Sequence, residues 1–320
     1  MLSALGVVAP IFALIGAGFL ARRLDALGPH ASRELNRFVV FLALPALLFD
    51  VMANVHAAQI WRPNFIGAFG LAVSIVFAAV VAARVLRGGA LADASLDGLS
   101  AGYGNTGYVG LPLGLIALGP QSQPLIIIAM LFTACLMFGV AIVLIEIDVQ
   151  DGARLGRLVF KVLSSLARNP LVVAPVAGGA LNAAGLAPPS EVEAAVRLLG
   201  AAASPCALVA LGLFFAGPRA KEAKSRPLAR GRGETATMAA FLALKLLAAP
   251  ALCFLFASRL FPLDPAATRV AVLMAALPTG TGAFMLAEYY GREIDLSSKV
   301  MLASTAASIL TLSAYLAVSG

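Results

Sequence analysis

Two short stretches interrupt long apolar segments with residues that can bind a small ion. One covers residues 102–112, with the sequence G-Y-G-N-T-G-Y-V-G-L-P, and the other covers residues 278–282, with P-T-G-T-G. Glycine and proline are poor helix formers, so each stretch predicts a break in an apolar helix. At a break, one half-helix presents free N–H groups that can hold an anion, and the other presents free carbonyls that can hold a cation.

Both stretches are therefore predicted to contribute to one binding site for a small organic anion. An asparagine amide can donate and accept hydrogen bonds, threonines add hydroxyls, and glycines let the backbone approach a ligand closely. The predicted site consists of Asn105, Thr106, Gly107, Tyr108, Pro112, Pro278, Thr279, Gly280, Thr281 and Gly282. The alternative is that the glycines and prolines only pack and kink the helices, as they often do in membrane proteins.

Four further residues lie in apolar segments where their chemistry calls for a reason. Lys245 is predicted to bind substrate, because a charge near a bilayer centre costs at least ~2.5 kcal/mol and has to face protein or water. It could instead pair with a buried acid or reach the interface. Asp50 could be a cation or proton site, or an interfacial carboxylate. Pro45 and Pro205 are predicted to kink helices that flank the two breaks, or simply to bend them.

No motif in the sequence indicates catalysis. We find no His/Cys/Asp/Glu cluster with metal-ligand spacing, no G-x-S-x-G nucleophile elbow and no nucleotide-binding P-loop. We therefore predict neither an enzyme nor a nucleotide-driven pump, with no cofactor and no bound metal. Na⁺ or H⁺ is left open as a coupling ion.

The composition places these segments in a membrane. Of the 320 residues, 61% are hydrophobic and 12% are charged, whereas soluble domains carry about 25% charged residues. With about 20 apolar residues needed to cross a bilayer, the chain divides into ten predicted spans, of which the fourth and ninth are broken. The spans cover residues 2–20, 36–53, 65–85, 96–118, 125–147, 170–184, 194–215, 236–260, 270–289 and 299–318.

The basic residues lie between these spans, so the net charge of +7 indicates topology and not nucleic-acid binding. Most of the 23 Lys and Arg fall in alternate loops, which the positive-inside rule assigns to the cytoplasm. We therefore expect a multi-pass protein of a cell (inner) membrane with both termini outside.

Short sequences also repeat between the two halves of the chain. V-V-A-P occurs at residues 7–10 and again at 172–175, and the broken fourth span corresponds to the broken ninth. Halves of five spans each must enter the membrane from opposite sides, because five is odd. The predicted fold is thus an all-α polytopic membrane protein, with residues 1–150 and 151–320 as two inverted five-helix repeats and with helices four and nine crossing.

Four motifs in order resemble the auxin efflux carrier family, which includes bacterial permeases of the malonate-transporter type. Asn105-Thr106 followed by G-L-P at 110–112 resembles the motif of that family's fourth span. R-N-P at 168–170, L-G-L-F at 211–214 and F-M-L-A-E-Y at 284–289 resemble those of the sixth, seventh and ninth spans. This sequence departs from the family pattern in one place. Plant members have a proline close before the phenylalanine of the ninth-span motif, whereas here Ala283 precedes Phe284 and Pro278 is further back. The position of the second break is therefore left open.

The resemblance implies ten spans in two inverted repeats, a scaffold domain beside a moving domain, and transport of small carboxylates. From the breaks and the resemblance together we predict a secondary transporter for a mono- or dicarboxylate, malonate-like or auxin-like, that works by alternating access. Its partners would be this substrate and the lipid bilayer, and a homodimer is left open. The alternatives are a receptor or scaffold that binds a small ligand without moving it, and an ion channel, for which no span has a long polar stripe.

Overall fold

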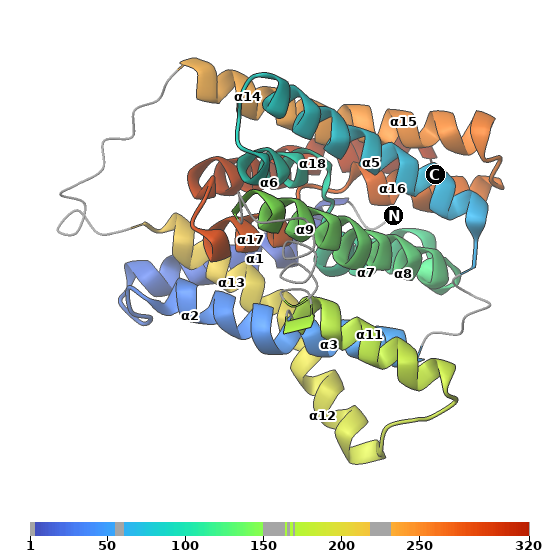
Figure 1. Cartoon of the computed structure of the whole chain (residues 1–320), viewed down its shortest axis with the longest axis horizontal. Helices are drawn as coiled ribbons and strands as arrows, with labels where there is room; N and C mark the ends of the chain where they lie inside the picture. The colour runs from blue at the N-terminus through green and yellow to red at the C-terminus, as the bar shows by residue number, and fades with distance from the viewer. Residues whose placement is uncertain are drawn as a thin grey trace. The chain divides into compact units, whose positions relative to one another are not determined.

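The computed structural model describes residues 4–54, 61–149, 164, 167–168, 170–217 and 232–319. Within these ranges every regular element is a helix, and one isolated bridge joins Gly104 to Thr279 (Figure 1). The prediction of an all-helical chain is therefore confirmed for the described residues. Asn169 of the motif at 168–170 and most of the loop that joins the two halves lie outside them.

Six helices are long and apolar enough to cross a membrane: Ala31–Asn54, Pro63–Leu86, Pro120–Val149, Ser190–Phe215, Glu234–Leu260 and Ile294–Val318. Each corresponds to a predicted span without a break. Shorter apolar helices cover Thr106–Leu118, Val172–Ala183 and Pro265–Ala276, and two of these lie in the spans predicted to be broken. The structure thus supports a multi-span protein, while the total of ten spans and their inverted arrangement stay predictions.

The chain forms two compact units, and each draws on both halves of the sequence. Unit 1 contains residues 1–7, 55–172 and 237–320, and unit 2 contains residues 8–54 and 173–236. This is a division by packing, and it differs in kind from the predicted division into repeats at residue 150. An inverted repeat relates segments by sequence and symmetry, so the units do not test it.

Unit 1 is built around α5 (Pro63–Leu86), which packs on α6 (Leu91–Gly102). Its buried phenylalanines and valines recur every three or four positions and form one face: Phe65, Phe69, Val73, Val76 and Val80. The remaining elements of the unit are η2 (Thr106–Gly110), α7 (Leu111–Leu118), η3 (Pro120–Ser122), α8 (Gln123–Leu131), η4 (Phe132–Met137), α9 (Phe138–Val149), α14 (Arg232–Ala243, in its C-terminal part), η5 (Leu244–Ala248), α15 (Ala249–Leu255), η6 (Phe256–Leu260), α16 (Pro265–Ala276), α17 (Thr281–Tyr290) and α18 (Ile294–Ser319).

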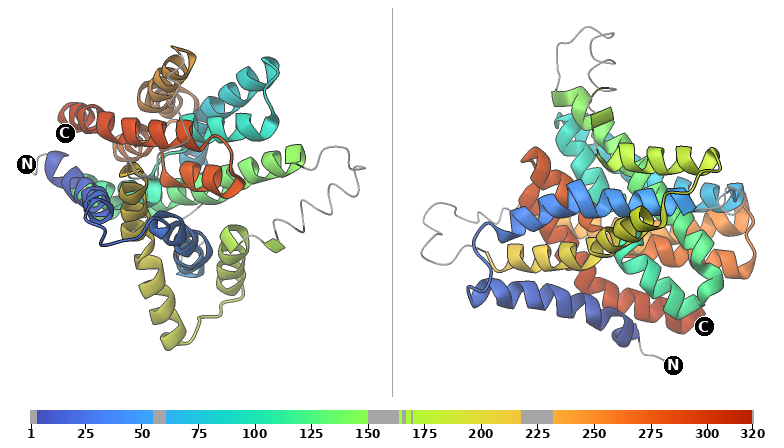
Figure 2. Two further views of the ribbon diagram at one scale, coloured as in Figure 1. Left: turned by 90° about the vertical axis from the view of Figure 1, so that its left-hand side faces the viewer. Right: turned by 90° about the horizontal axis from the view of Figure 1, so that it is seen from below.

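Unit 2 packs its helices at the distance of backbone contact. A Cβ atom added to Gly212 would lie 1.9 Å from the carbonyl oxygen of Ile15, and one added to Gly18 would lie 2.1 Å from that of Val209. Small residues at helix interfaces allow such close approach. The helices of this unit, visible in Figure 2, are α1 (Ala4–Arg23), α2 (Ala31–Phe38), η1 (Val39–Ala43), α3 (Leu44–Asn54), most of α11 (Pro170–Ala183), α12 (Ser190–Ala201) and α13 (Ala203–Phe215).

Three π-helical turns share one local cause. In each, a proline stands two positions beyond the last π residue: Val39–Ala43 precedes Pro45, Thr106–Gly110 precedes Pro112, and Leu244–Ala248 precedes Pro250. Proline has no N–H to bond the carbonyl four positions earlier, and that carbonyl lies inside the π turn. A turn widened to i→i+5 bonding is how the helix accommodates the missing donor.

Candidate functional site

Both predicted breaks are present, and each is short. The first lies between the end of α6 at Gly102 and the start of η2 at Thr106, with Tyr103 in an extended conformation. The second lies between the end of α16 at Ala276 and the start of α17 at Thr281. The second break therefore covers residues 277–280, so that Thr281 and Gly282, predicted to lie within it, open the following helix.

The two breaks bond directly to each other within unit 1. The N–H of Asn105 donates to the carbonyl of Pro278, and the N–H of Gly280 donates to the carbonyl of Tyr103, both at 2.9 Å. The two bonds are reciprocal and form the antiparallel bridge between Gly104 and Thr279. Each break thereby satisfies backbone groups that the other leaves free, as burial at membrane depth requires.

Glycine is required at position 280 by the closeness of the two breaks. A Cβ atom there would lie 2.4 Å from the ring of Tyr103 and 3.1 Å from the carbonyl oxygen of Gly104. The backbone of Gly280 is extended, with φ −73°, so the requirement comes from contact and not from an unusual dihedral angle. The ring of Tyr103 is itself buried and packs against Phe138.

The two bonded breaks, residues 103–105 and 277–280, are called the crossing below. Hydroxyl groups from neighbouring helices form hydrogen bonds that stabilise it. Ser304 of α18 accepts a hydrogen bond from the N–H of Thr279 at 3.0 Å, and the hydroxyl of Thr279 donates to the carbonyl of Ser100 at 2.8 Å. The Thr106 hydroxyl is 2.6 Å from that of Thr133. Sequence reasoning missed the supporting residues, although serines at 297, 304 and 308 share one helical face by their spacing of seven and four.

These bonds separate the predicted site residues into supports and groups still able to bind a ligand. The hydroxyls of Thr106 and Thr279 are engaged inside the protein. By contrast, the Asn105 side chain accepts from the N–H of Tyr108 at 3.3 Å through its oxygen, while its amide nitrogen bonds to no described residue. The hydroxyl of Thr281 is buried and has no hydrogen-bond partner within the described ranges. Both groups stand where a half-helix begins: Asn105 directly precedes η2, and Thr281 is the first residue of α17.

Lys245 lies next to both breaks of the crossing. Its side chain is fully buried, and its Nζ donates to the carbonyl of Ala275 at 2.7 Å. Ala275 is in the last turn of α16, and a Cβ atom added to Gly104 would be 3.5 Å from the ammonium. The structure thus places this lysine at the carbonyl end of the second break.

The other predicted residues divide between the two units. Gly107 and the buried Tyr108 lie in η2, and Pro112 is the second residue of α7. Pro45 follows the π turn η1, and Pro205 follows the interruption between α12 and α13 at Ala202. These two prolines belong to unit 2, and their effect on helix direction stays a prediction.

Asp50, also in unit 2, has partners at the protein surface. Its carboxylate accepts from the amide of Asn54 at 2.8 Å and from Arg197 at 3.4 Å. This arrangement is typical of an interfacial carboxylate, and a role in cation or proton binding is untested. Within the described residues, no group of three or more His, Cys, Asp or Glu side chains could hold a metal ion.

A cluster of charged residues in unit 1 was not anticipated. The side chain of Asp97 is 1% exposed and lies 2.5 Å from Nε of Arg84, whose Nη2 is 3.1 Å from Glu293. Arg292 forms two hydrogen bonds to Asp93, at 2.6 and 3.1 Å, and these raise the pKa of Arg292 above its ordinary value. Sequence reasoning used the arginines only as topology signals and overlooked the aspartate in an apolar segment.

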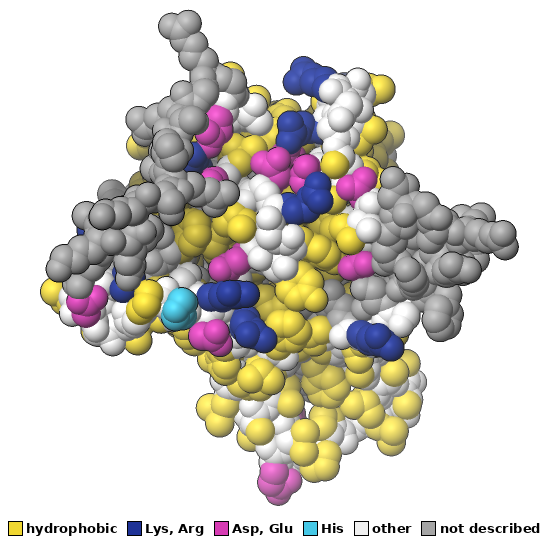
Figure 3. All heavy atoms as spheres, turned by 60° about the vertical axis from the view of Figure 1, so that its left-hand side comes forward, with side chains coloured by type: hydrophobic (Ala, Val, Ile, Leu, Met, Phe, Trp, Pro, Cys, Tyr) yellow, Lys and Arg dark blue, Asp and Glu magenta, His cyan; other side chains and the backbone are white. Residues whose placement is uncertain are grey.

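Charged side chains of both signs also lie interleaved on the surface drawn in Figure 3.

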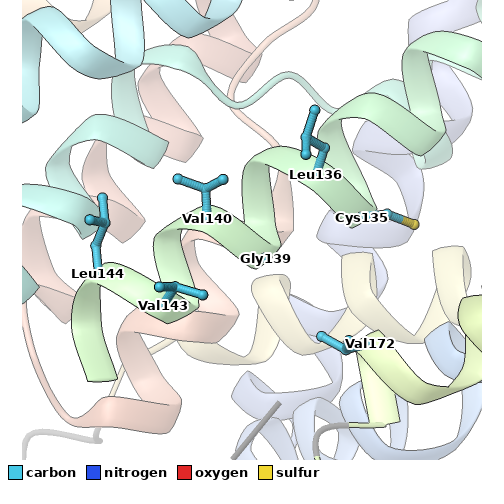
Figure 4. Close-up of a pocket in the computed structure, with 7 residues that line it drawn as sticks. All are labelled: Cys135, Leu136, Gly139, Val140, Val143, Leu144 and Val172. Carbon is cyan, nitrogen blue, oxygen red and sulfur yellow. The ribbon is translucent and has the colours of Figure 1, made fainter. Parts of the chain in front are cut away.

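A separate cavity of about 330 Å³ lies against α9 (Figure 4). Its lining is apolar and consists of Cys135, Leu136, Gly139, Val140, Val143, Leu144 and Val172. An anion needs hydrogen-bond donors, and this lining offers none beyond a thiol, so we locate the candidate site at the crossing instead.

The helical fold and the paired, bonded breaks define a class: a multi-pass membrane protein with the discontinuous helices that line transporter sites. Comparison with known proteins agrees, because the chain belongs to the membrane transport protein family, whose family model matches residues 3–316. This confirms the resemblance to the auxin efflux carrier family, and with it the expectation of a transporter rather than an enzyme.

Two relatives illustrate the range of this family. The chain is 31% identical over 312 residues to a "Putative malonate transporter" of Rhizobium meliloti, a match that covers 97% of this chain and 94% of the relative. It is 24% identical over 311 residues to a "Probable auxin efflux carrier component 5a" of Oryza sativa subsp. japonica, covering 84% and 83% respectively.

Proposed function

We propose that this protein is a secondary transporter that binds a small carboxylate at the crossing of its two broken helices and moves it by alternating access. The observation that carries the proposal is the reciprocal pair of backbone hydrogen bonds between the breaks, with unused donors on both sides of it. Close packing alone does not require unused polar groups beside a break. A ligand-binding site does.

The chemistry of the unused groups favours an anion. The amide nitrogen of Asn105 and the hydroxyl of Thr281 are both hydrogen-bond donors. The positive ends of two half-helix dipoles add to them, so an anion can be bound without an arginine in the site. A carboxylate of malonate-like or auxin-like size suits these donors, and the names of the relatives agree with this substrate class.

The architecture we propose is ten spans in two inverted five-helix repeats. The reciprocity of the bridge supports it, since a two-fold axis in the membrane plane would exchange the two bonds. The mixing of the two sequence halves in each unit supports it as well. In alternating access, unit 1 would carry the bound anion as one body, because hydroxyl contacts and backbone bonds tie its breaks to α18 and α8–η4. Both termini outside an inner membrane and a homodimer belong to the same proposal, and the choice between Na⁺, H⁺ and no coupling ion is left to experiment.

Uptake into proteoliposomes tests the function. The purified protein should accumulate labelled malonate or indole-3-acetate, and one of these should raise its melting temperature by mass action. Asn105→Asp keeps an oxygen that can accept from the N–H of Tyr108 but adds a negative charge, so we expect a folded protein with at least ~10-fold weaker anion binding. Asn64→Asp, at an exposed asparagine in α5, is the matched control and should transport normally.

The same experiment separates transport from the receptor alternative. A carboxylate that stabilises the protein but never enters the vesicles would identify a receptor or scaffold. Equal uptake by the Asn105→Asp and wild-type proteins would place the substrate elsewhere. Imposed Na⁺ and H⁺ gradients, applied one at a time, would identify any coupling ion.

A further inference from the structure

The second break creates a site for a positive charge. α16 ends at Ala276, so its last carbonyls have no N–H partner within the helix, and the negative end of the helix dipole is buried beside them. The carbonyl of Ala275 points to the ammonium of Lys245, and the carbonyl of Met274 lies against Gly104. In carriers with broken helices, carbonyls and half-helix ends of this kind coordinate Na⁺ or H⁺.

Lys245 reaches this position from a different helix. The residue lies in the π turn η5, and its side chain is fully buried. Within the described part of the chain it forms no ion pair with a carboxylate, and its hydrogen bond goes to Ala275. A buried ammonium is costly unless other groups compensate its charge. Here the compensating groups are the same carbonyls that would otherwise attract a cation.

We propose that the ammonium of Lys245 is a tethered cation that fills the cation site of the crossing, so that carboxylate transport by this protein needs no Na⁺. The inference rests on the proposed transport function. It assigns to Lys245 a role beside the substrate rather than in contact with it: the lysine neutralises the carbonyl end of α16 and supplies fixed positive charge where the anion binds. A soluble ion would have to be bound again in every transport cycle, and a covalent side chain does not.

The first test measures the melting temperature of the purified full-length protein in NaCl, KCl and choline chloride at equal ionic strength. We expect the same value in all three salts. Lys245→Ala should lower the melting temperature by several degrees, because it leaves the buried carbonyl of Ala275 without its hydrogen-bond donor and leaves an empty space beside it. Propylammonium matches the lost side chain beyond Cβ, so at millimolar concentration it should restore most of that loss. Lys245→Met fills the space without a charge and should gain nothing from propylammonium.

Lys299→Ala is the matched control, since it removes an ammonium from α18 of the same unit, and propylammonium should not change its melting temperature. Stabilisation of the wild-type protein by Na⁺ over K⁺ would overturn the proposal, as would a Lys245→Ala protein that propylammonium does not stabilise.

Uptake then separates this inference from the proposed function. Wild-type uptake that requires Na⁺ contradicts the tethered cation alone, whereas no uptake or binding of any carboxylate, with the melting results as expected, contradicts the transport function alone.

Discussion

Unit 1 and unit 2 bury different kinds of atoms. Of the described polar and charged side chains that are buried, only Arg22 and Asn36 belong to unit 2, while serines, threonines, Asp97, Asn105 and Lys245 are buried in unit 1. Unit 2 instead brings helix backbones together across glycines such as Gly212 and Gly18. The difference shows that a predominantly apolar chain can build one unit on backbone contact between helices and another around two polar, broken helices.

The largest expected effect is on the backbone contacts of unit 2. Gly212→Ala should destabilise the protein by about 3 kcal/mol or more, because its Cβ atom would overlap the backbone of Ile15. Thermal unfolding in detergent measures this. Gly16→Ala is the control, since nothing lies within 4 Å of its added Cβ atom, and it should be neutral or stabilising by up to about 1 kcal/mol. Equal melting temperatures for the two variants would refute close packing in unit 2.

The next effect concerns the contact between the two breaks in unit 1. Gly280→Ala pushes against the buried ring of Tyr103, and we expect a loss of about 2 kcal/mol in stability together with reduced uptake. The nearest neighbour is the side chain of Tyr103, and the backbone oxygen of Gly104 is farther away at 3.1 Å, so the smaller Tyr103→Leu should relieve part of the overlap. A double-mutant cycle in thermal unfolding measures this coupling. Strictly additive effects would mean that residue 280 does not press on the ring.

A smaller effect is expected from the support that α18 gives to the crossing. Ser304→Ala leaves the N–H of Thr279 buried without its acceptor, which should cost about 1–2 kcal/mol. Ser308→Ala serves as the control on the same helix, because among the described residues its hydroxyl bonds only to the carbonyl of Thr305 one turn away. Melting temperatures and malonate uptake of both variants should be compared. Equal losses of melting temperature and of uptake in the two serine variants would contradict the prediction.

The smallest effects concern ion pairs, one from each unit. Asp93 and Arg292 in unit 1 form two hydrogen bonds while partly exposed, and a double-mutant cycle with Asp93→Asn and Arg292→Gln should give about 0.5–1 kcal/mol that declines with salt. Asp50 and Arg197 in unit 2 approach only to 3.4 Å, with Arg197 well exposed, so their coupling should be close to zero. A stronger coupling in unit 2 would contradict the contrast between the units.

The sequence alone determined the class of protein and the two places where its helices break. Hydropathy over some 20 residues is a local property, and so is the poor helix propensity of glycine and proline. Both could therefore be read without knowing the contacts. The breaks appeared at the predicted stretches, and only their exact limits, residues 103–105 and 277–280, needed the structure.

Only the tertiary structure decided which polar groups support the crossing and which are left for a ligand. The bond from Thr279 to Ser100 joins residues 179 positions apart, and the pairing of Lys245 with Ala275 and of Arg84 with Asp97 is likewise non-local. No local sequence pattern predicts such partners, because a hydrogen bond forms only where the distance and direction between two groups in space allow it. The residue types thus specified what chemistry was available, and packing determined where it was already used.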